Sequence, residues 1–190
     1  MSMTVNRKQD TRIARKFHKI LADIPGGVAV NVAVLGGEYL YEGTPITAAS
    51  SGICSVCKFA KVVTQVANDA TAIEVGKNSH FKIGDIVLAS VGAKAHTITA
   101  IDKTNTAKDV ITIDTTLGEV VGVGAYIYEA AAVSTTTTSA LKNVAQSLIG
   151  TGGLVIADTN FITDAVIIGV TIGNDVPALY KATLTGIINI

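Results

Sequence analysis

The chain has 190 residues and no net formal charge, with 48% hydrophobic and only 16% charged residues, whereas soluble proteins usually carry about a quarter charged residues. We expect no transmembrane helix, because no apolar run is long enough, and no signal peptide, because no apolar segment follows the polar N-terminus. The apolar mass is mainly Val, Ile and Ala, with no Trp and 18 Gly. This composition favours β-structure, and the low charge favours burial of surface between copies.

The N-terminal segment differs from the rest in charge and in periodicity. Residues 1–25 carry a charge of +4 and the remainder −4, and this asymmetry is typical of an interaction arm. Apolar residues recur at the spacing of one helix face, which predicts an amphipathic helix over 6–24 that ends at Pro25. The face consists of Ile13, Phe17, Ile20, Leu21 and Ile24. Its partner is either the rest of the chain or another protein, while a membrane surface or a nucleic acid is the weaker alternative.

After Gly26-Gly27 the pattern changes to alternating or continuous apolar runs separated by polar turns. We expect strands at residues 28–35, 39–41, 60–66, 71–75, 86–90, 95–101, 110–113 and 121–129. Short strands at such regular intervals indicate a small barrel or sandwich. The predicted fold class is therefore mainly β: a small β-barrel or sandwich body with an N-terminal amphipathic helix and a β-rich C-terminal oligomerisation region.

The C-terminal part begins with a Thr- and Ser-rich stretch, residues 134–139, which we interpret as a linker or an exposed edge. A short helix is predicted over 140–150, followed by strands at 154–157, 165–171 and 185–190. The run at 165–170 is apolar without alternation, as in a strand covered on both faces. The expected organisation is an anchor arm (1–27), a body (28–133) and an oligomerisation region (134–190).

Residues that could carry chemistry are few and do not form a recognisable set. Cys54 and Cys57 make a CxxC spacing, but they lie in a small-residue loop without the helix of a redox motif or the second ligand pair of a zinc site. His18, His80 and His96 are scattered along the chain, and no nucleophile elbow occurs. We therefore predict no catalytic residues, no metal site, no cofactor and no enzymatic activity.

Several stretches resemble bacteriophage head-fibre and capsid decoration proteins. The first is the series HFKIGDIV (80–87), AHTITAID (95–102) and DVITIDTTLG (109–118). The second is the Val/Ile-rich run 165–173 followed by DVPAL (175–179), and the third is the turn EGTPI (42–46). The resemblance implies a trimer on the outside of a capsid, anchored by the N-terminal part, with the major capsid protein as partner.

We therefore expect a virion structural protein, made in the bacterial host cytoplasm and placed on the capsid exterior, as a decoration or head-fibre subunit. Another virion component, such as a head–tail connector or tail protein, and a host-surface-adhesion fibre module remain alternatives. We expect no nucleic-acid or membrane partner. The predicted capsid-binding residues are Arg12, Ile13, Arg15, Lys16, Phe17, Ile20 and Ile24. The predicted interface of a homo-oligomer, with a trimer as the expected state, consists of Val166, Ile168, Val170, Ile172, Ile187, Ile188 and Ile190.

Overall fold

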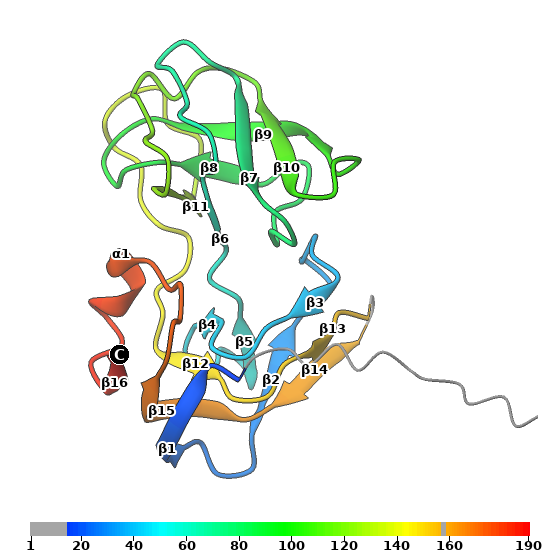
Figure 1. Cartoon of the computed structure of the whole chain (residues 1–190), viewed down its shortest axis with the longest axis vertical. Coiled ribbons are helices and arrows are strands. Elements are labelled where there is room, and N and C mark those ends of the chain that lie inside the picture. Colours follow the sequence, from blue (N-terminus) through cyan, green and yellow to red (C-terminus); the bar gives the residue numbers. More distant parts are fainter. Residues whose placement is uncertain (1–14, 157–158) are drawn as a thin grey trace, which may run out of the picture.

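The computed structural model describes residues 15–156 and 159–190, and within them the chain folds into sixteen strands and one single-turn helix, α1 (Ala178–Lys181). The strands are arranged in two lobes, one above the other in Figure 1. The six-stranded lobe comprises residues 59–129. The composite lobe combines strands that precede this segment with strands that follow it. The predicted mainly β class is thus confirmed.

The six-stranded lobe is one antiparallel sheet in the order β6-β11-β8-β9-β10-β7. Its strands are β6 (Phe59–Lys61), β7 (Ala72–Gly76), β8 (Ile86–Leu88), β9 (Ala95–Asp102), β10 (Lys108–Ile113) and β11 (Tyr126–Glu129). The predicted barrel is wrong, because the sheet does not close. The two end strands of the sheet are β6 and β7. β6 is only three residues long, and the residue after it, Val62, forms only an isolated bridge with Val75 of β7.

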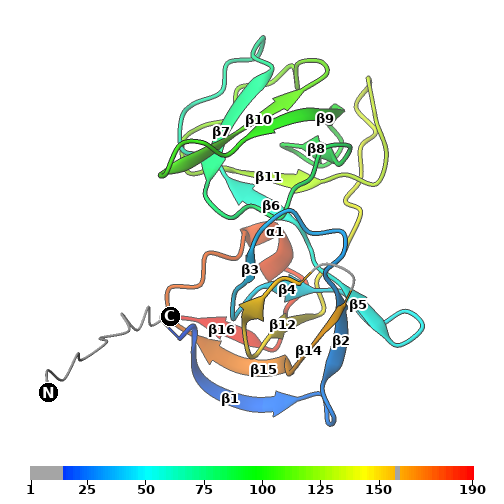
Figure 2. The same ribbon diagram turned by 90° about the vertical axis from the view of Figure 1, so that its right-hand side faces the viewer.

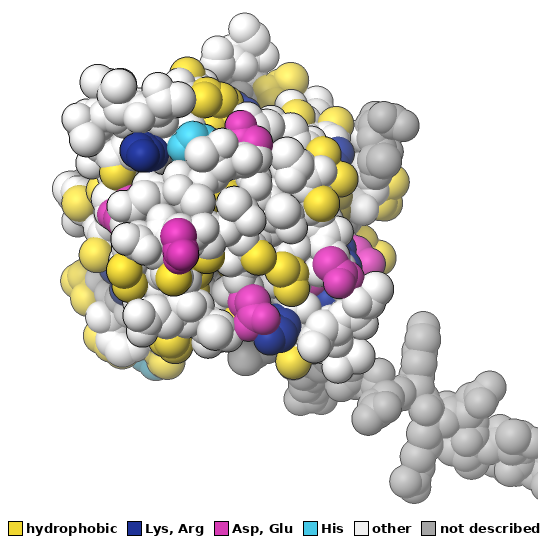
Figure 3. Space-filling model, turned by 90° about the horizontal axis from the view of Figure 1, so that it is seen from above, with side chains coloured by type: hydrophobic (Ala, Val, Ile, Leu, Met, Phe, Trp, Pro, Cys, Tyr) yellow, Lys and Arg dark blue, Asp and Glu magenta, His cyan; other side chains and the backbone are white. Residues whose placement is uncertain are grey.

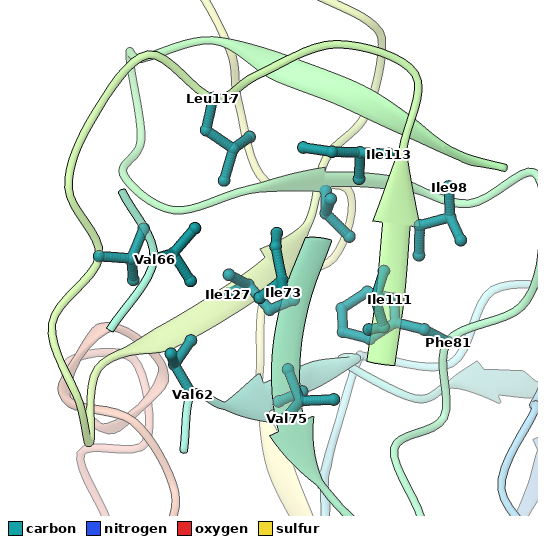
Figure 4. Packing of buried hydrophobic residues seen from close by; sticks show 13 residues of the cluster. Val62, Val66, Ile73, Val75, Phe81, Ile98, Ile111, Ile113, Leu117 and Ile127 are labelled. Carbon is teal, nitrogen blue, oxygen red and sulfur yellow. The ribbon is translucent and has the colours of Figure 1, made fainter. Parts of the chain in front are cut away.

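A hydrophobic cluster fills the inside of this curved sheet (Figure 4). Side chains of β10 alternate between half-buried and buried positions, so that Ile111 and Ile113 reach the cluster. Ile73 and Val75 do the same from β7, and Phe81 reaches it from the loop before β8. The alternation of apolar residues therefore directs these strands to a common core.

The composite lobe contains three small sheets. The largest has the order β1-β15-β12-β4, with β16 also paired to β15, and Figure 2 shows β1 beside β15 at its base. The others have the orders β14-β2-β5 and β13-β3. Their strands are β1 (Phe17–Asp23), β2 (Val28–Asn31), β3 (Tyr39–Leu40), β4 (Pro45–Ile46), β5 (Ile53–Ser55), β12 (Ser147–Ile149), β13 (Gly153–Leu154), β14 (Asn160–Thr163), β15 (Ala165–Thr171) and β16 (Ile187–Asn189).

These pairings join parts of the chain that are far apart in sequence. β1 pairs with β15, β2 with β14, and β4 with β12. These pairings therefore cross the expected boundaries at residues 27 and 133. The division into three separate units stays a prediction. The Thr-rich stretch is attached to the six-stranded lobe, since Ser134 forms a bridge with Ala95.

The N-terminal helix predicted over residues 6–24 is not supported. Residues 1–14 lie outside the described part, and β1 occupies the remainder as a strand. Its backbone bonds to β15, with register shifts near Phe17, Ile20 and Ala22. Pairing with a distant strand prevails here over the local helical spacing, because tertiary context overrides weak local preference.

The helix predicted over residues 140–150 is also wrong. Residues 147–149 form β12, a buried strand between β15 and β4. The preceding segment is irregular and makes a bridge between Ala130 and Leu141. The apolar spacing of Leu141, Ala145 and Leu148 reflects packing in a cluster with Tyr180, not one face of a helix.

Candidate functional site: an aliphatic sheet face and a buried charge cluster

One face of the sheet formed by β1, β15 and β16 carries aliphatic side chains that nothing in the described chain covers. Val170 lies opposite Lys19 on β1 and opposite Ile188 on β16, and side chains of directly opposed residues project from the same face. By the alternation of a strand, their second neighbours along the chain share it. The alternation stops before the buried Val166, where the pairing of β1 with β15 shifts register. We call this surface the aliphatic face; it consists of Ile168, Val170, Ile172, Ile188 and Ile190.

The exposure of these side chains is high for their type. Ile188 is 62% and Ile190 66% exposed, and Ile168 and Ile172 are also exposed, while Val170 is half-buried. The opposite face of the same sheet is packed around Thr171, which is buried, and Ile187, which contacts the cluster around Tyr180, whereas Ile167 is 42% exposed. Elsewhere, on the end of the molecule seen in Figure 3, hydrophobic side chains are scattered among polar atoms.

The residues predicted for the oligomer interface are thus divided between two environments. Five of the seven form the aliphatic face. Val166 is fully buried inside the composite lobe, and Ile187 is half-buried against the cluster around Tyr180. The unbroken apolar run in β15 therefore includes positions for both the interior and the surface.

The residues predicted for capsid binding do not form one stripe. Phe17 packs against the cluster around Tyr180 and Ile24 against the core of the composite lobe, whereas Ile20 is exposed. Lys16 donates from its Nζ to the carbonyl of Gly173 at 2.9 Å. Arg15 is exposed. Arg12 and Ile13 lie outside the described residues.

The two lobes are joined by a loop of the composite lobe that is pressed against the six-stranded lobe. The amide of Gly36 donates to the carbonyl of His80 at 2.9 Å, and Asn78 Oδ1 accepts from the amides of Glu38 and Tyr39 at 2.9 and 3.2 Å. A Cβ on Gly37 would lie 2.6 Å from His80 Nδ1. Gly36-Gly37 is therefore a contact point between the two lobes.

His80 is enclosed in this junction and is unpaired. Its side chain is buried, and Nδ1 has no hydrogen-bond partner among the described residues. Burial, together with the positive charges of Lys58 and Lys103, lowers the pKa of His80 to about 4. The ring is therefore neutral at ordinary pH.

A cleft of about 450 Å³ also lies between the lobes. Tyr41, Phe59, Lys61, Lys77 and Asp175 are among its lining residues. Several of its polar groups are already used within the protein: Lys77 binds Asp109 at 2.6 Å, and Lys61 lies 3.9 Å from Asp175. The cleft has the size of a small-molecule site, but its polar groups do not converge on one point.

Four charged side chains meet at the six-stranded lobe: three lie at the ends of neighbouring strands, and Lys142 reaches them from the segment before β12. Lys58 immediately precedes β6, Glu129 ends β11, and Asp85 immediately precedes β8. Lys58 Nζ lies 2.6 Å from Asp85 Oδ2 and 3.3 Å from Glu129 Oε1. Lys142, which lies at the protein surface, binds the same Glu129 oxygen through its Nζ at a distance of 2.8 Å.

The part of this cluster formed by Lys58, Glu129 and Asp85 is largely shielded from water, whereas the side chain of Lys142 is 51% exposed. The side chains of Lys58 and Glu129 are each 2% exposed, and that of Asp85 is 15% exposed. Buried charges of this kind are tolerated only when they are paired. Sequence reasoning missed the cluster, although one signal was available: in the alternating strand β11, Glu129 stands at a core-facing position two residues after the buried Ile127.

The other candidate groups stay apart. Cys54 and Cys57 are buried free thiols, and burial with the nearby charge of Glu129 raises the pKa of Cys57 to about 12, so its thiol is not activated. His96, on β9, contacts Asp114 at 3.2 Å. Over residues 15–156 and 159–190, no three His, Cys, Asp or Glu side chains are grouped as metal ligands would be.

Comparisons with protein-family models, with curated proteins and with solved structures found no match for this chain. In the part that the structure describes, no helix has the length and apolar character needed to cross a membrane. The aliphatic face and the buried charge cluster are therefore interpreted from their own geometry.

Proposed function

We propose that this protein is a non-enzymatic virion structural protein that binds the outside of a phage capsid as a homo-oligomeric decoration or head-fibre subunit. The class comes from the sequence resemblance to such proteins. The observation that supports assembly most directly is the aliphatic face on β15 and β16. An exposed apolar surface of this kind is typical of an interaction site in a soluble protein.

A second copy of the chain is the partner that fits this face best. The face carries five aliphatic side chains and, on β1, one positive charge from Lys19. On β1, Lys19 lies opposite Val170 and Ala22 opposite Ile168. The acidic Asp23 lies beyond them, opposite the buried Val166, so the aliphatic side chains themselves offer little to a charged ligand. Contacts between identical subunits commonly have such an apolar centre, and closed rotational symmetry lets every copy bury the same surface.

Charge substitution on the aliphatic face tests the assembly. Ile188→Asp should convert the trimer of the wild-type protein to a monomer at micromolar concentration, because each contact would bury an unpaired carboxylate. Light scattering coupled to size-exclusion chromatography measures the mass. The matched control is Ile83→Asp, since Ile83 is 66% exposed but lies in the six-stranded lobe; it should stay trimeric. A monomeric wild-type protein would refute the proposal.

Location in the virion tests the rest of the proposal. Electron cryomicroscopy of purified virions, compared with virions that lack the protein, should show its density on the outer capsid surface at repeated symmetry-related positions. Density confined to a ring at the neck or to the tail would instead identify a head–tail connector or a tail protein. Loss of host attachment without any change in capsid decoration would favour an adhesion module.

A further inference from the structure

The buried charge cluster has the composition and geometry of a site for amide-bond formation between side chains. A primary amine and a carboxyl group are in direct contact, with Lys58 Nζ 2.6 Å from Asp85 Oδ2. A second carboxylate, that of Glu129, lies 3.3 Å from the same nitrogen. This is the arrangement of a nucleophile, an electrophile and a group able to transfer protons between them.

The strands hold these groups rigidly in place. Glu129 donates its backbone N–H to the carbonyl of Lys58 at 3.2 Å, and Glu129 is paired with Val87, two residues after Asp85. β11 thus lies between the two reacting segments, and all three side chains project from the face that also carries the buried Val87 and Ile127. A fixed near-contact of this type greatly raises the rate of a reaction between two groups.

We propose that Lys58 and Asp85 join in an intramolecular isopeptide bond, formed once per folded chain and assisted by Glu129. One proton of the Lys58 ammonium passes to the Asp85 carboxylate across their short contact, which leaves a neutral amine beside a carboxylic acid. The amine lone pair then forms the N–C bond at Asp85 Cγ. Glu129 takes the second proton from nitrogen and delivers it to the hydroxyl group that leaves as water.

The balance of this reaction needs no other reactant. An ammonium and a carboxylate give one amide and one water molecule, with no oxidation or reduction. The backbone N–H of Lys82 donates to Asp85 Oδ2 at 2.8 Å and so holds in place the carboxyl oxygen that takes the first proton from Lys58 and later leaves as water. The dry surroundings favour loss of water and exclude hydrolysis.

Charge conservation in the cluster supports the same interpretation. Before the reaction Lys58 and Lys142 balance Asp85 and Glu129. The amide removes one positive and one negative charge, and the remaining pair of Lys142 and Glu129, 2.8 Å apart, is again balanced. No buried charge is left unpaired at either stage, which would otherwise be costly.

Two other close ion pairs in the same lobe provide internal controls. Lys77 lies 2.6 Å from Asp109, and Lys108 lies 2.6 Å from Glu74. Among the described residues, neither lysine has a second carboxylate within ion-pair distance. Both lysines are also much more exposed than Lys58. They should therefore stay unlinked under conditions in which Lys58 and Asp85 have reacted.

Mass spectrometry of the denatured full-length protein tests the proposal. Most wild-type molecules should be lighter than the sequence mass by one water. Tryptic mapping should yield a branched peptide that joins the segment containing Lys58 to that containing Asp85, with no cleavage after Lys58 and no linkage at Lys77 or Lys108. Wild-type protein that is folded, kept at ambient temperature for days and still has its full sequence mass would refute it, as would water loss mapped to any other site.

Variants identify the roles of the three residues. Lys58→Arg keeps the charge but has no primary amine, so it should retain its full mass. Asp85→Asn should lose one ammonia instead of one water. Glu129→Gln should fold, as judged by circular dichroism, yet lose water at least tenfold more slowly. An equal rate in a folded Glu129→Gln protein would overturn the role of Glu129, and the wild-type mass remains decisive if that variant does not fold.

Discussion

At the scale of single residues, His80 makes the stability of the lobe junction depend on pH. Its pKa is about 4 in the folded protein and 6.5 in an ordinary environment, above all because burial disfavours the charged ring. The unfolded chain therefore binds a proton between these pH values that the folded chain does not. The stability contributed by the neutral ring is complete above pH 6.5 and is lost as the pH falls towards 4.

We expect this single group to cost the protein about 3 kcal/mol of unfolding free energy when the pH falls from 7 to below 4. Denaturant unfolding measured over that range is the test. In His80→Gln, which removes the titration, the decline should be smaller by about that amount. Parallel curves for wild type and variant would show that acid acts at other groups.

Gly36 is a second residue whose role is defined by the lobe junction. A Cβ at this position would overlap the backbone carbonyl of Phe81, and backbone cannot move aside as a flexible side chain can. Gly36→Ala should therefore lower the unfolding free energy by about 1–3 kcal/mol, the usual cost of overpacking. Gly122→Ala is the matched control, since a Cβ there meets no atom within 4 Å, and thermal unfolding should show it unchanged or slightly stabilised.

At the scale of elements, β1 shows how a helical pattern can belong to a strand. The spacing of Phe17, Ile20 and Ile24 predicts one continuous apolar face, but two of these side chains point into different cores and Ile20 is exposed. The strand is specified by pairing with β15, which is about 150 residues further along the chain. Local periodicity contains no information about so distant a partner.

If residues 17–23 form a strand, substitutions at Phe17 and Ile20 should reduce stability by different amounts. If these residues formed one helical stripe, the two losses would be similar. Phe17→Asp should destabilise the protein by about 3 kcal/mol, because it places a carboxylate against the cluster around Tyr180. Ile20→Asp should change stability by less than about 1 kcal/mol, as is usual at exposed positions. Denaturant unfolding of the two variants checks this, and equal losses would contradict the strand.

Other elements could be predicted because their signals are local. The alternating apolar residues of β7 and β10 indicate strands, and the structure places their Ile and Val side chains in one cluster. The role of Asp85 could not be predicted from the sequence, because its partners Lys58 and Glu129 are brought to it only by the order of β6, β11 and β8 in the sheet.

At the scale of the whole molecule, the two lobes share one hydrophobic cluster. Cys57, Tyr180 and Leu148 pack there with Phe59 and Tyr128 of the six-stranded lobe. The hydroxyl of Tyr180 also donates to the carbonyl of Lys58 at 3.4 Å. This cluster joins three distant parts of the chain.

The nesting of one lobe within the other also has a consequence for synthesis. Every strand of the six-stranded lobe lies between residues 59 and 129, so this lobe can form while later residues are still being translated. β1, β2 and β4 must wait until β15, β14 and β12 emerge from the ribosome. The nascent chain therefore carries unpaired apolar strands during this interval, and long-range pairing of this kind is slow. The aliphatic face is completed last, when β16 pairs with β15, so under the proposed assembly a chain would offer this face only after closing its own sheets.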